Sequence, residues 1–278
     1  MPNIYFILFE LIIYLQFAVC LHHAWRQGIA DVLRLFAGVF YGVILEFATI
    51  RQLDAYHYGR FVLMILDVPL CIGVAWSCVI YSAMEFSEAS SIPYWARPIM
   101  DGLLALNIDL ALDAVAIRLG FWDWGQGLHF QYFGVPYANF WAWFWVVFSF
   151  SLGYRLLAHR EDWIVRWISP LLAVLVGLAG VLGTNIIIAY EIPFQDHRWF
   201  VLATLVLALI LIATMRPSFS KAPTLVFWIP FLTHAYVLTA GATSGVIFHP
   251  PFLLWVGILM VAAATYLHRA TVLHLFHR

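Results

Sequence analysis

Two aspartates in an otherwise apolar stretch are the residues whose type and spacing could do chemistry. Asp109 and Asp113 lie within LLALNIDLALDAVAIRL. Four residues of α-helix place both carboxyl groups on one face, with about 6 Å of rise between them. Burial and a neighbouring carboxyl group both favour the neutral acid, which can donate a proton, and its partner can accept one. The spacing therefore predicts an acid–base pair, with Asp113 as the proton donor.

A structural role for these carboxyl groups is the alternative. A charged side chain in the membrane interior costs roughly 2.5–3.5 kcal/mol on insertion scales, so an aspartate retained there has a partner or a task. The partner could be an arginine or a polar group that fixes the packing of a neighbouring helix. Asp101 lies two turns earlier on the same slowly drifting stripe and is the alternative partner of the pair. A carboxylate so close to the start of a helix, however, commonly stabilises the helix N-terminus as a cap.

Polar residues in other apolar segments are candidates for the same cavity. A polar side chain that faced lipid would lack a hydrogen-bond partner, so these residues are expected to turn inward. The candidates are Glu46, Asp67, Asn139, Asn185 and His234. We expect the first three to surround the cavity of Asp113. Each of the five could equally make an ordinary hydrogen bond between helices.

The longest connection, GFWDWGQGLHFQYFGVP at residues 120–136, carries many aromatic side chains around turn-forming glycines. It could form an aromatic belt at the membrane surface. It could instead form a lid with an aromatic wall beside the site, because ring faces stabilise a nearby cation. The second interpretation gives four residues a contact with substrate: Trp122, Trp124, Tyr132 and Phe133.

No motif for a metal or a redox cofactor accompanies these residues. The chain lacks the HxxxH and HxxHH clusters of membrane di-iron oxygenases, and it also lacks a GxGxxG after a strand and a GxSxG nucleophile motif. The remaining economical reaction is proton donation from a carboxylic acid to an apolar substrate. We therefore expect no cofactor.

The composition indicates that these elements lie in lipid. Of 278 residues, 64% are hydrophobic and 10% are charged, and the mean hydropathy is +0.90. Too few polar side chains remain to cover a soluble globule. We predict an all-α, polytopic transmembrane bundle of about eight or nine spans in a single membrane domain, residues 1–278, whose first span is a retained helix and not a signal peptide. The nine candidate spans are 4–21, 33–50, 61–83, 98–119, 137–157, 168–189, 199–215, 224–243 and 252–268.

The basic residues predict the orientation of this bundle. Under the nine-span arrangement the 14 Lys and Arg divide ten against four. The ten are Arg26, Arg34, Arg97, Arg155, Arg160, Arg166, Arg216, Lys221, Arg269 and Arg278, and the four are Arg51, Arg60, Arg118 and Arg198. The excess predicts a cytoplasmic C-terminus in the cytoplasmic membrane, although a bundle of eight spans would place both termini on the same side. A net charge of -1 and the absence of a long basic run argue against a nucleic-acid partner.

Several of these stretches carry a family resemblance. ARPIMDGLLALNIDLALDAVAIRLGFWDW and YFGVPYANFWAWF resemble the core of the integral membrane carotenoid biosynthesis protein family, whose members include the hydratases of the bacterioruberin and γ-carotene pathways. GVILEFATI, AYHYG and VPLCIGVAWSCVIY resemble the helices that precede this core. The resemblance covers approximately residues 38–147.

The resemblance implies an enzyme that adds water to the terminal C=C bond of an acyclic carotenoid, without a cofactor, and gives a tertiary alcohol. Its partners would be the lipid-soluble carotenoid and the membrane lipid. Protonation of such an alkene gives a tertiary carbocation, which suits a neutral carboxylic acid at Asp113. Three other functions stay open: an end-group cyclase, a non-enzymatic carotenoid- or lipid-binding protein, and a proton-coupled transporter, although no internal repeat supports the last.

Overall fold

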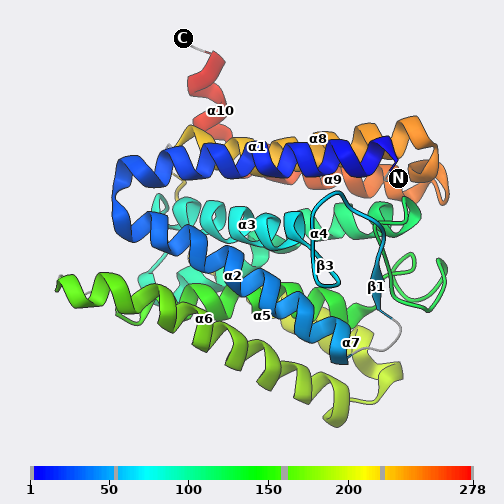
Figure 1. Ribbon diagram of the computed structural model, residues 1–278, viewed down its shortest axis with the longest axis horizontal. Helices are drawn as coiled ribbons and strands as arrows, with labels where there is room; N and C mark the ends of the chain where they lie inside the picture. The colour runs from blue at the N-terminus through cyan, green and yellow to red at the C-terminus, as the bar shows by residue number, and fades with distance from the viewer. Residues whose placement is uncertain (1–2, 53–55, 158–161, 220–222, 277–278) are drawn as a thin grey trace.

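The computed structural model describes residues 3–52, 56–157, 162–219 and 223–276, and its architecture is all-α (Figure 1). The α-helices in these ranges are α1 (Ile4–Gln27), α2 (Ile29–Gln52), α3 (Leu70–Glu88), α4 (Arg97–Arg118), α5 (Tyr137–Arg155), α6 (Trp163–Ile186), α7 (His197–Thr214), α8 (Thr224–Ser244), α9 (Phe252–Leu267) and α10 (Arg269–Phe276). Short helical turns are η1 (Tyr94–Ala96), η2 (Ile187–Glu191), η3 (Phe194–Asp196) and η4 (Val246–Phe248). The two-residue strands are β1 (His57–Tyr58), β2 (Met64–Ile65), β3 (Val68–Pro69) and β4 (Trp122–Asp123).

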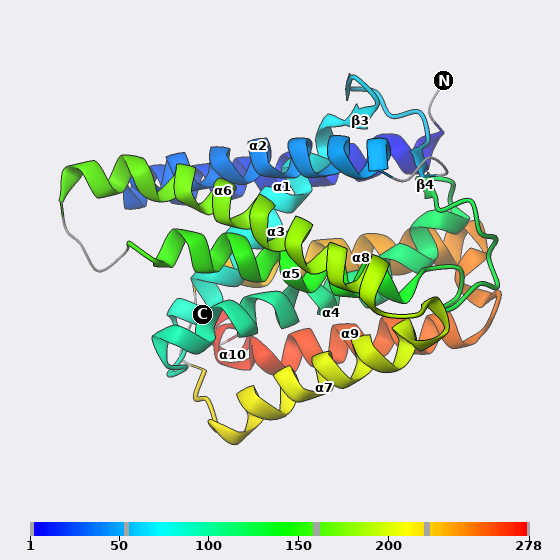
Figure 2. The same ribbon diagram turned by 90° about the horizontal axis from the view of Figure 1, so that it is seen from below.

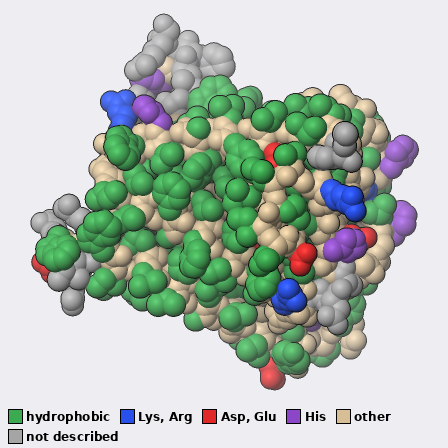
Figure 3. Space-filling model, in the orientation of Figure 1, with side chains coloured by type: hydrophobic (Ala, Val, Ile, Leu, Met, Phe, Trp, Pro, Cys, Tyr) green, Lys and Arg blue, Asp and Glu red, His purple; other side chains and the backbone are tan. Residues whose placement is uncertain are grey.

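The predicted helical membrane bundle is confirmed. Among the described residues, six helices are long and apolar enough to cross a membrane, namely α1, α2, α3, α6, α7 and α8. Helix α9 is apolar but shorter. Helix α4, which is more polar, and helix α5, which is more aromatic, run alongside the others (Figures 1 and 2). Hydrophobic side chains cover most of the face in Figure 3, and most of the charged and histidine side chains visible there lie towards its two ends.

Helix α4 is the interior helix that carries the aspartates. It packs against α3, α5, α8 and α9, and also contacts α7. Because neighbours surround it on several sides, Asp101, Asp109 and Asp113 are buried, with exposed fractions of 0–2%. The aspartates therefore face other helices and not lipid.

Helices α2 and α3 approach closely through two glycines. A Cβ atom on Gly42 would lie 2.8 Å from the Cβ of Trp76 and 3.0 Å from the Cα of Gly73. Without these side chains the two backbones come together, as small residues allow in membrane helices. Glu46, one turn after Gly42, is thereby placed beside the Trp76 ring.

The third predicted span is wrong at its start. Helix α3 begins at Leu70 and not at residue 61, because Pro69 lacks an N–H and residues 64–69 pair as a hairpin in which Met64 faces Pro69 and Ile65 faces Val68. Leu66, in the turn, has a φ of 56°. Asp67 therefore lies in an exposed turn and not inside a helix.

The helical connections gather at two ends of the bundle. At one end, named the site end below, β1 pairs with β4, so the α2–α3 connection contacts the α4–α5 connection. Arg118 Nε also donates to the His249 carbonyl of the α8–α9 connection, at 3.0 Å. At the other end, named the opposite end, Ser90 pairs with Phe219.

The basic residues follow this division into two ends. The four arginines predicted to share a side belong to elements of the site end: Arg51, Arg60, Arg118 and Arg198. Of the other ten basic residues, Arg160, Lys221 and Arg278 lie outside the described residues. Which end faces the cytoplasm stays a prediction from the charge count.

Candidate functional site

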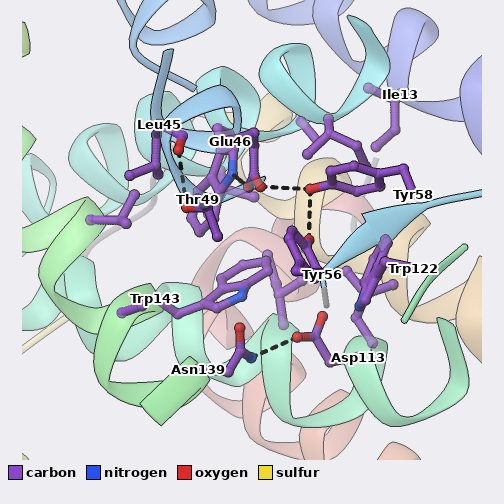
Figure 4. Close-up of a pocket in the computed structure, with 18 of the residues that line it drawn as sticks. Ile13, Leu45, Glu46, Thr49, Tyr56, Tyr58, Asp113, Trp122, Asn139 and Trp143 are labelled. Atoms are coloured by element: carbon purple, nitrogen blue, oxygen red, sulfur yellow. Dashed lines mark hydrogen bonds between the residues drawn. The ribbon is translucent and has the colours of Figure 1, made fainter. Parts of the chain in front are cut away.

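An apolar cavity near the site end contains Asp113 in its wall (Figure 4). Side chains from α1 to α6, from α8 and from the two connections joined by β1 and β4 surround it. Its free volume is about 100 Å³. Since one water needs about 10–15 Å³ of such volume, the cavity has room for a few waters or for one small branched hydrocarbon group.

The two aspartates of α4 share one hydrogen-bond donor on α5. The Asn139 side-chain amide donates to Asp113 Oδ2 at 2.6 Å and to Asp109 Oδ1 at 3.2 Å. Helix α5 begins after Pro136, which leaves Asn139 in its first turn, directly opposite the last two turns of α4. One amide group thus connects both carboxyl groups, as the four-residue spacing requires.

The two aspartates differ in what their remaining oxygens contact. Asp113 lines the cavity, and its Oδ1 is buried without a hydrogen-bond partner among the described residues. Asp109 is fully buried behind it and is not part of the cavity wall. Asp113 is therefore the carboxyl group that a molecule in the cavity would meet.

In the part of the chain that the structure describes, no three His, Cys, Asp or Glu side chains are grouped as metal ligands.

A third carboxyl group, that of Glu46 on α2, lies across the cavity from Asp113 (Figure 4). It accepts a hydrogen bond from Trp76 Nε1 at 2.7 Å on one oxygen and from the Tyr58 hydroxyl at 2.6 Å on the other. The Tyr56 hydroxyl donates to that of Tyr58 at 2.8 Å. Two tyrosines and a carboxylate thus form a continuous hydrogen-bonded chain.

The two tyrosine hydroxyls of this chain stay protonated. Both residues lie in the connection between α2 and α3 and are packed into the bundle. Burial first, and the nearby Glu46 carboxyl second, raise the pKa of the Tyr56 and Tyr58 hydroxyls well above the ordinary tyrosine value. Each hydroxyl therefore keeps its proton available for donation.

Tryptophan rings form much of the remaining wall. Trp124 stacks on Tyr56 with centroids 4.4 Å apart and an interplanar angle of 24°. Trp122 meets Tyr58 edge to face at 6.1 Å, and Trp143 packs on Trp76 at 4.3 Å. All of these residues line the cavity, so a molecule inside it would contact several aromatic faces.

A polar surface hollow lies on the outer side of the two tyrosines. Its free volume is about 720 Å³, and Tyr56 and Tyr58 belong to the walls of both the hollow and the cavity. Among the described residues, its other polar side chains are Arg51, His57, Arg60 and Asp67. The tyrosine pair is therefore the partition between a polar surface and an apolar interior.

The structure brings some of the residues predicted from sequence together and separates others. Glu46, Asn139, Asn185, Trp122 and Trp124 line the cavity with Asp113. Asp67 lines only the surface hollow, since the third helix begins after it.

Three further predicted residues lie away from the cavity. The Tyr132 hydroxyl donates to the Leu110 carbonyl at 3.1 Å, and Phe133 packs on the Tyr132 ring, so neither belongs to the cavity wall. His234 pairs with Asn107 through Nε2, at 3.0 Å, elsewhere in the bundle.

Asp101 has a structural partner. Arg155 Nη1 on α5 donates to Asp101 Oδ2 at 2.6 Å, and the Ser151 hydroxyl donates to the same oxygen at 2.6 Å. The other terminal nitrogen of Arg155 donates to the Ser87 hydroxyl on α3 at 2.9 Å. Asp101 lies about 12 Å along α4 from Asp109, and this buried ion pair joins α3, α4 and α5 towards the opposite end.

Sequence reasoning did not single out several residues of the wall. Tyr56 and Tyr58 lie in a connection, and only the long-range pairing of β1 with β4 turns them inward. Gln16 on α1 and Thr233 on α8 also line the cavity and hydrogen-bond to each other at 3.0 Å. The polar Gln16 within an apolar helix was the one local signal that could have identified this contact.

Comparison with known proteins identifies the family. The model of the carotenoid biosynthesis protein family matches residues 3–194, a wider range than the resemblance at residues 38–147. That range holds Asp109, Asp113 and Glu46, both tyrosines and all of α1 to α6. Comparison with curated proteins and with solved structures gives no match. This chain, a membrane protein with an acid-lined apolar cavity, belongs to the carotenoid biosynthesis protein family and has a role in carotenoid biosynthesis.

Proposed function

We propose that this protein is a hydratase that adds water to the terminal C=C bond of an acyclic carotenoid end group and gives a tertiary alcohol. The observation that carries the proposal is the unpartnered Oδ1 of Asp113 in the wall of an apolar cavity. A buried polar atom without a partner is costly, so its retention calls for a functional reason. A carboxylic acid aimed at a hydrocarbon is the group that protonation of an alkene needs.

The size of the cavity supports an end group as the reacting part. A volume of about 100 Å³ cannot hold a whole carotenoid, whereas it can hold the branched terminus of one. The terminal double bond would then lie beside Asp113, and the rest of the polyene would extend out of the cavity. Membrane lipid is the medium from which such a substrate would enter.

The reaction divides into protonation and capture by water. The Asp113 carboxyl group gives its proton to the less substituted alkene carbon, which leaves a tertiary carbocation on the other. The Asn139 amide, 2.6 Å from Asp113 Oδ2, stabilises the carboxylate that forms, since hydrogen bonds to an ionised acceptor are the stronger ones. Asp109 shares that amide, so the two carboxyl groups hold their protons as one coupled pair and Asp109 can return a proton to Asp113.

The aromatic wall suits the cationic intermediate. Ring faces carry negative charge density and attract a nearby cation. Trp122, Trp124 and Trp143 supply such rings around the cavity, and they also exclude bulk water. No redox cofactor enters this reaction, since addition of water changes no overall oxidation state.

The test is pigment analysis after expression in cells that accumulate lycopene. The expected product is heavier than the substrate by one water, or by two if both ends react. Asp113→Asn keeps the shape and most hydrogen bonds but has no acidic proton, and it should abolish turnover while the protein still inserts in the membrane. The matched control is Asp196→Asn, an exposed aspartate before α7 whose side chain makes no capping hydrogen bond.

Other results would overturn the proposal. An isomeric product would identify a cyclase, which begins with the same protonation but captures the cation within the substrate. An unchanged pigment that still copurifies with the protein would identify a binding protein. Full hydration by both Asp109→Asn and Asp113→Asn would remove the acid–base pair from the mechanism.

A further inference from the structure

We propose that Tyr56, Tyr58 and Glu46 form the side of the cavity that binds water and accepts its proton, opposite the proton donor Asp113. This inference rests on the proposed hydration and adds to it the source of the water and the destination of its proton. Asp109, the predicted base, is fully buried and outside the cavity wall. Another group that reaches the cavity must therefore take that proton.

The direction of the hydrogen bonds makes this chain a proton acceptor. An ionised carboxylate can only accept hydrogen bonds, and both Glu46 oxygens receive one, from Trp76 and from Tyr58. The Tyr58 hydrogen is therefore committed to Glu46, and the Tyr58 oxygen must accept the hydrogen of Tyr56. The Tyr56 oxygen, at the end of the chain, keeps its lone pairs for a hydrogen of water.

The location of the tyrosines supplies the water. Tyr56 and Tyr58 are the partition between the polar surface hollow and the apolar cavity. Figure 4 shows Tyr56 between the Glu46–Tyr58 pair and the Asp113–Asn139 pair. Water that enters from the hollow would thus meet the Tyr56 hydroxyl before it meets the cation beside Asp113. The opposite walls keep acid and base apart and set the water on one side of the alkene.

The proton and electron balance closes without another reactant. Asp113 gives its proton to the alkene and becomes a carboxylate. A water lone pair then forms the C–O bond to the cation, and the oxonium ion passes one proton to Tyr56 as Tyr56 passes its own to Tyr58 and Tyr58 passes its own to Glu46. Alkene and water have become the alcohol, and Glu46 is now the acid. One proton carried by water from Glu46 back to the coupled Asp109–Asp113 pair restores the site.

The experiment separates protonation from capture by water. Membranes from lycopene-accumulating cells that express each variant are incubated in D₂O, and the pigments are analysed by mass spectrometry. Reversible deuteration by Asp113 followed by loss of a proton places deuterium in the recovered acyclic carotenoid. Hydration adds the elements of D₂O, of which the carbon-bound deuterium is retained and the hydroxyl deuterium exchanges for hydrogen during extraction. The ratio of hydration to exchange reports how often the cation is captured before it loses a proton.

Tyr56→Phe and Glu46→Gln should lower this ratio with protonation retained. Tyr56→Phe removes the end of the chain but keeps the ring that stacks on Trp124. Glu46→Gln reverses the chain, because an amide donates to Tyr58. Loss of a general base typically costs 10²–10⁴-fold, so hydration should fall about a hundredfold or more while deuterium exchange persists. Tyr236→Phe is the matched control, since the Tyr236 hydroxyl donates to the Tyr5 carbonyl outside the cavity.

The outcomes keep this inference distinct from the proposed function. Suppose that both Tyr56→Phe and Glu46→Gln keep the wild-type ratio, while Asp113→Asn loses both signals. This result would overturn the role of Tyr56, Tyr58 and Glu46 as proton acceptor and would leave the hydratase intact. Loss of both signals in Tyr56→Phe or Glu46→Gln, at normal membrane abundance, would also overturn this role. The replaced residue would then be needed for protonation. Absence of both hydration and exchange in the wild type would refute the hydratase itself, and with it the proposed proton acceptor.

Discussion

Asp109 and Asp113 have the same side chain, the same helix and the same hydrogen-bond donor, yet they occupy different positions in the site. Four residues of helix place both opposite Asn139, but only Asp113 reaches the cavity. Sequence spacing predicts the shared face, because the helical period fixes it. The spacing cannot tell which carboxyl group borders empty space, since that depends on the packing of α1, α2 and α3 across the cavity.

Replacement of Asn139 tests whether its amide stabilises the Asp113 carboxylate. Asn139→Leu keeps the approximate volume and removes the amide that would stabilise the Asp113 carboxylate. A hydrogen bond to a charged group contributes about 1.5–3 kcal/mol, which corresponds to a rate loss of roughly ten- to a hundredfold. We expect hydration of the acyclic carotenoid to slow by this factor, measured as initial rate per amount of protein in the membrane.

The matched control for Asn139 is Asn107 on α4. The Asn107 side chain is a half-buried amide that hydrogen-bonds to His234 and to the Met260 carbonyl and lies outside the cavity wall. Asn107→Leu should lower thermal stability through its lost hydrogen bonds and leave the rate per folded molecule close to that of the wild type. Equal rate losses in the two variants would mean that Asn139 acts through stability alone.

At the scale of elements, the sequence predicts helices well and connections poorly. Apolar runs of sufficient length identify the helices because lipid forces every backbone polar group into a hydrogen bond within the chain. The same argument misassigns residues 61–69, an apolar run that pairs as a hairpin because Pro69 stops the helix. Tyr56 and Tyr58 are missed for a related reason, since a loop folds inward only when a distant strand, β4, pairs with it.

The element-scale prediction tests the α2–α3 contact that positions Glu46. A methyl group on Gly42 would meet Trp76 Cβ and the Gly73 backbone at 2.8–3.0 Å, so Gly42→Ala must push the two helices apart. Overpacking of this kind costs typically about 1–3 kcal/mol. We expect a lower Tm in detergent, followed by circular dichroism, and a weaker contact between Glu46 and Trp76. Gly183→Ala on α6, where a Cβ meets nothing within 4 Å, should leave Tm unchanged or raise it.

At the scale of the whole molecule, the two ends of the bundle are specialised. The cavity, the tyrosine partition and the polar hollow all belong to the site end, whereas the Asp101–Arg155 ion pair lies towards the opposite end. The charge count, ten basic residues against four, could be made from the sequence once the spans were known. The structure gives this charge count a functional meaning, because it places the cavity at the end that has four basic residues.

The positive-inside rule then predicts that the site end faces away from the cytoplasm. Water and its proton would be exchanged with that side, and the tail beyond α9 would lie in the cytoplasm. Gln126→Cys in the α4–α5 connection should react with a membrane-impermeant maleimide in intact cells, and Gln27→Cys at the opposite end should react only after the cells are opened. Both positions are exposed, and the native cysteines Cys20, Cys71 and Cys78 are buried, so they give little background. The reverse labelling pattern would invert the bundle and make the cytoplasm the source of the water, because the cavity is fixed to the site end by β1 and β4 whichever way the protein is inserted.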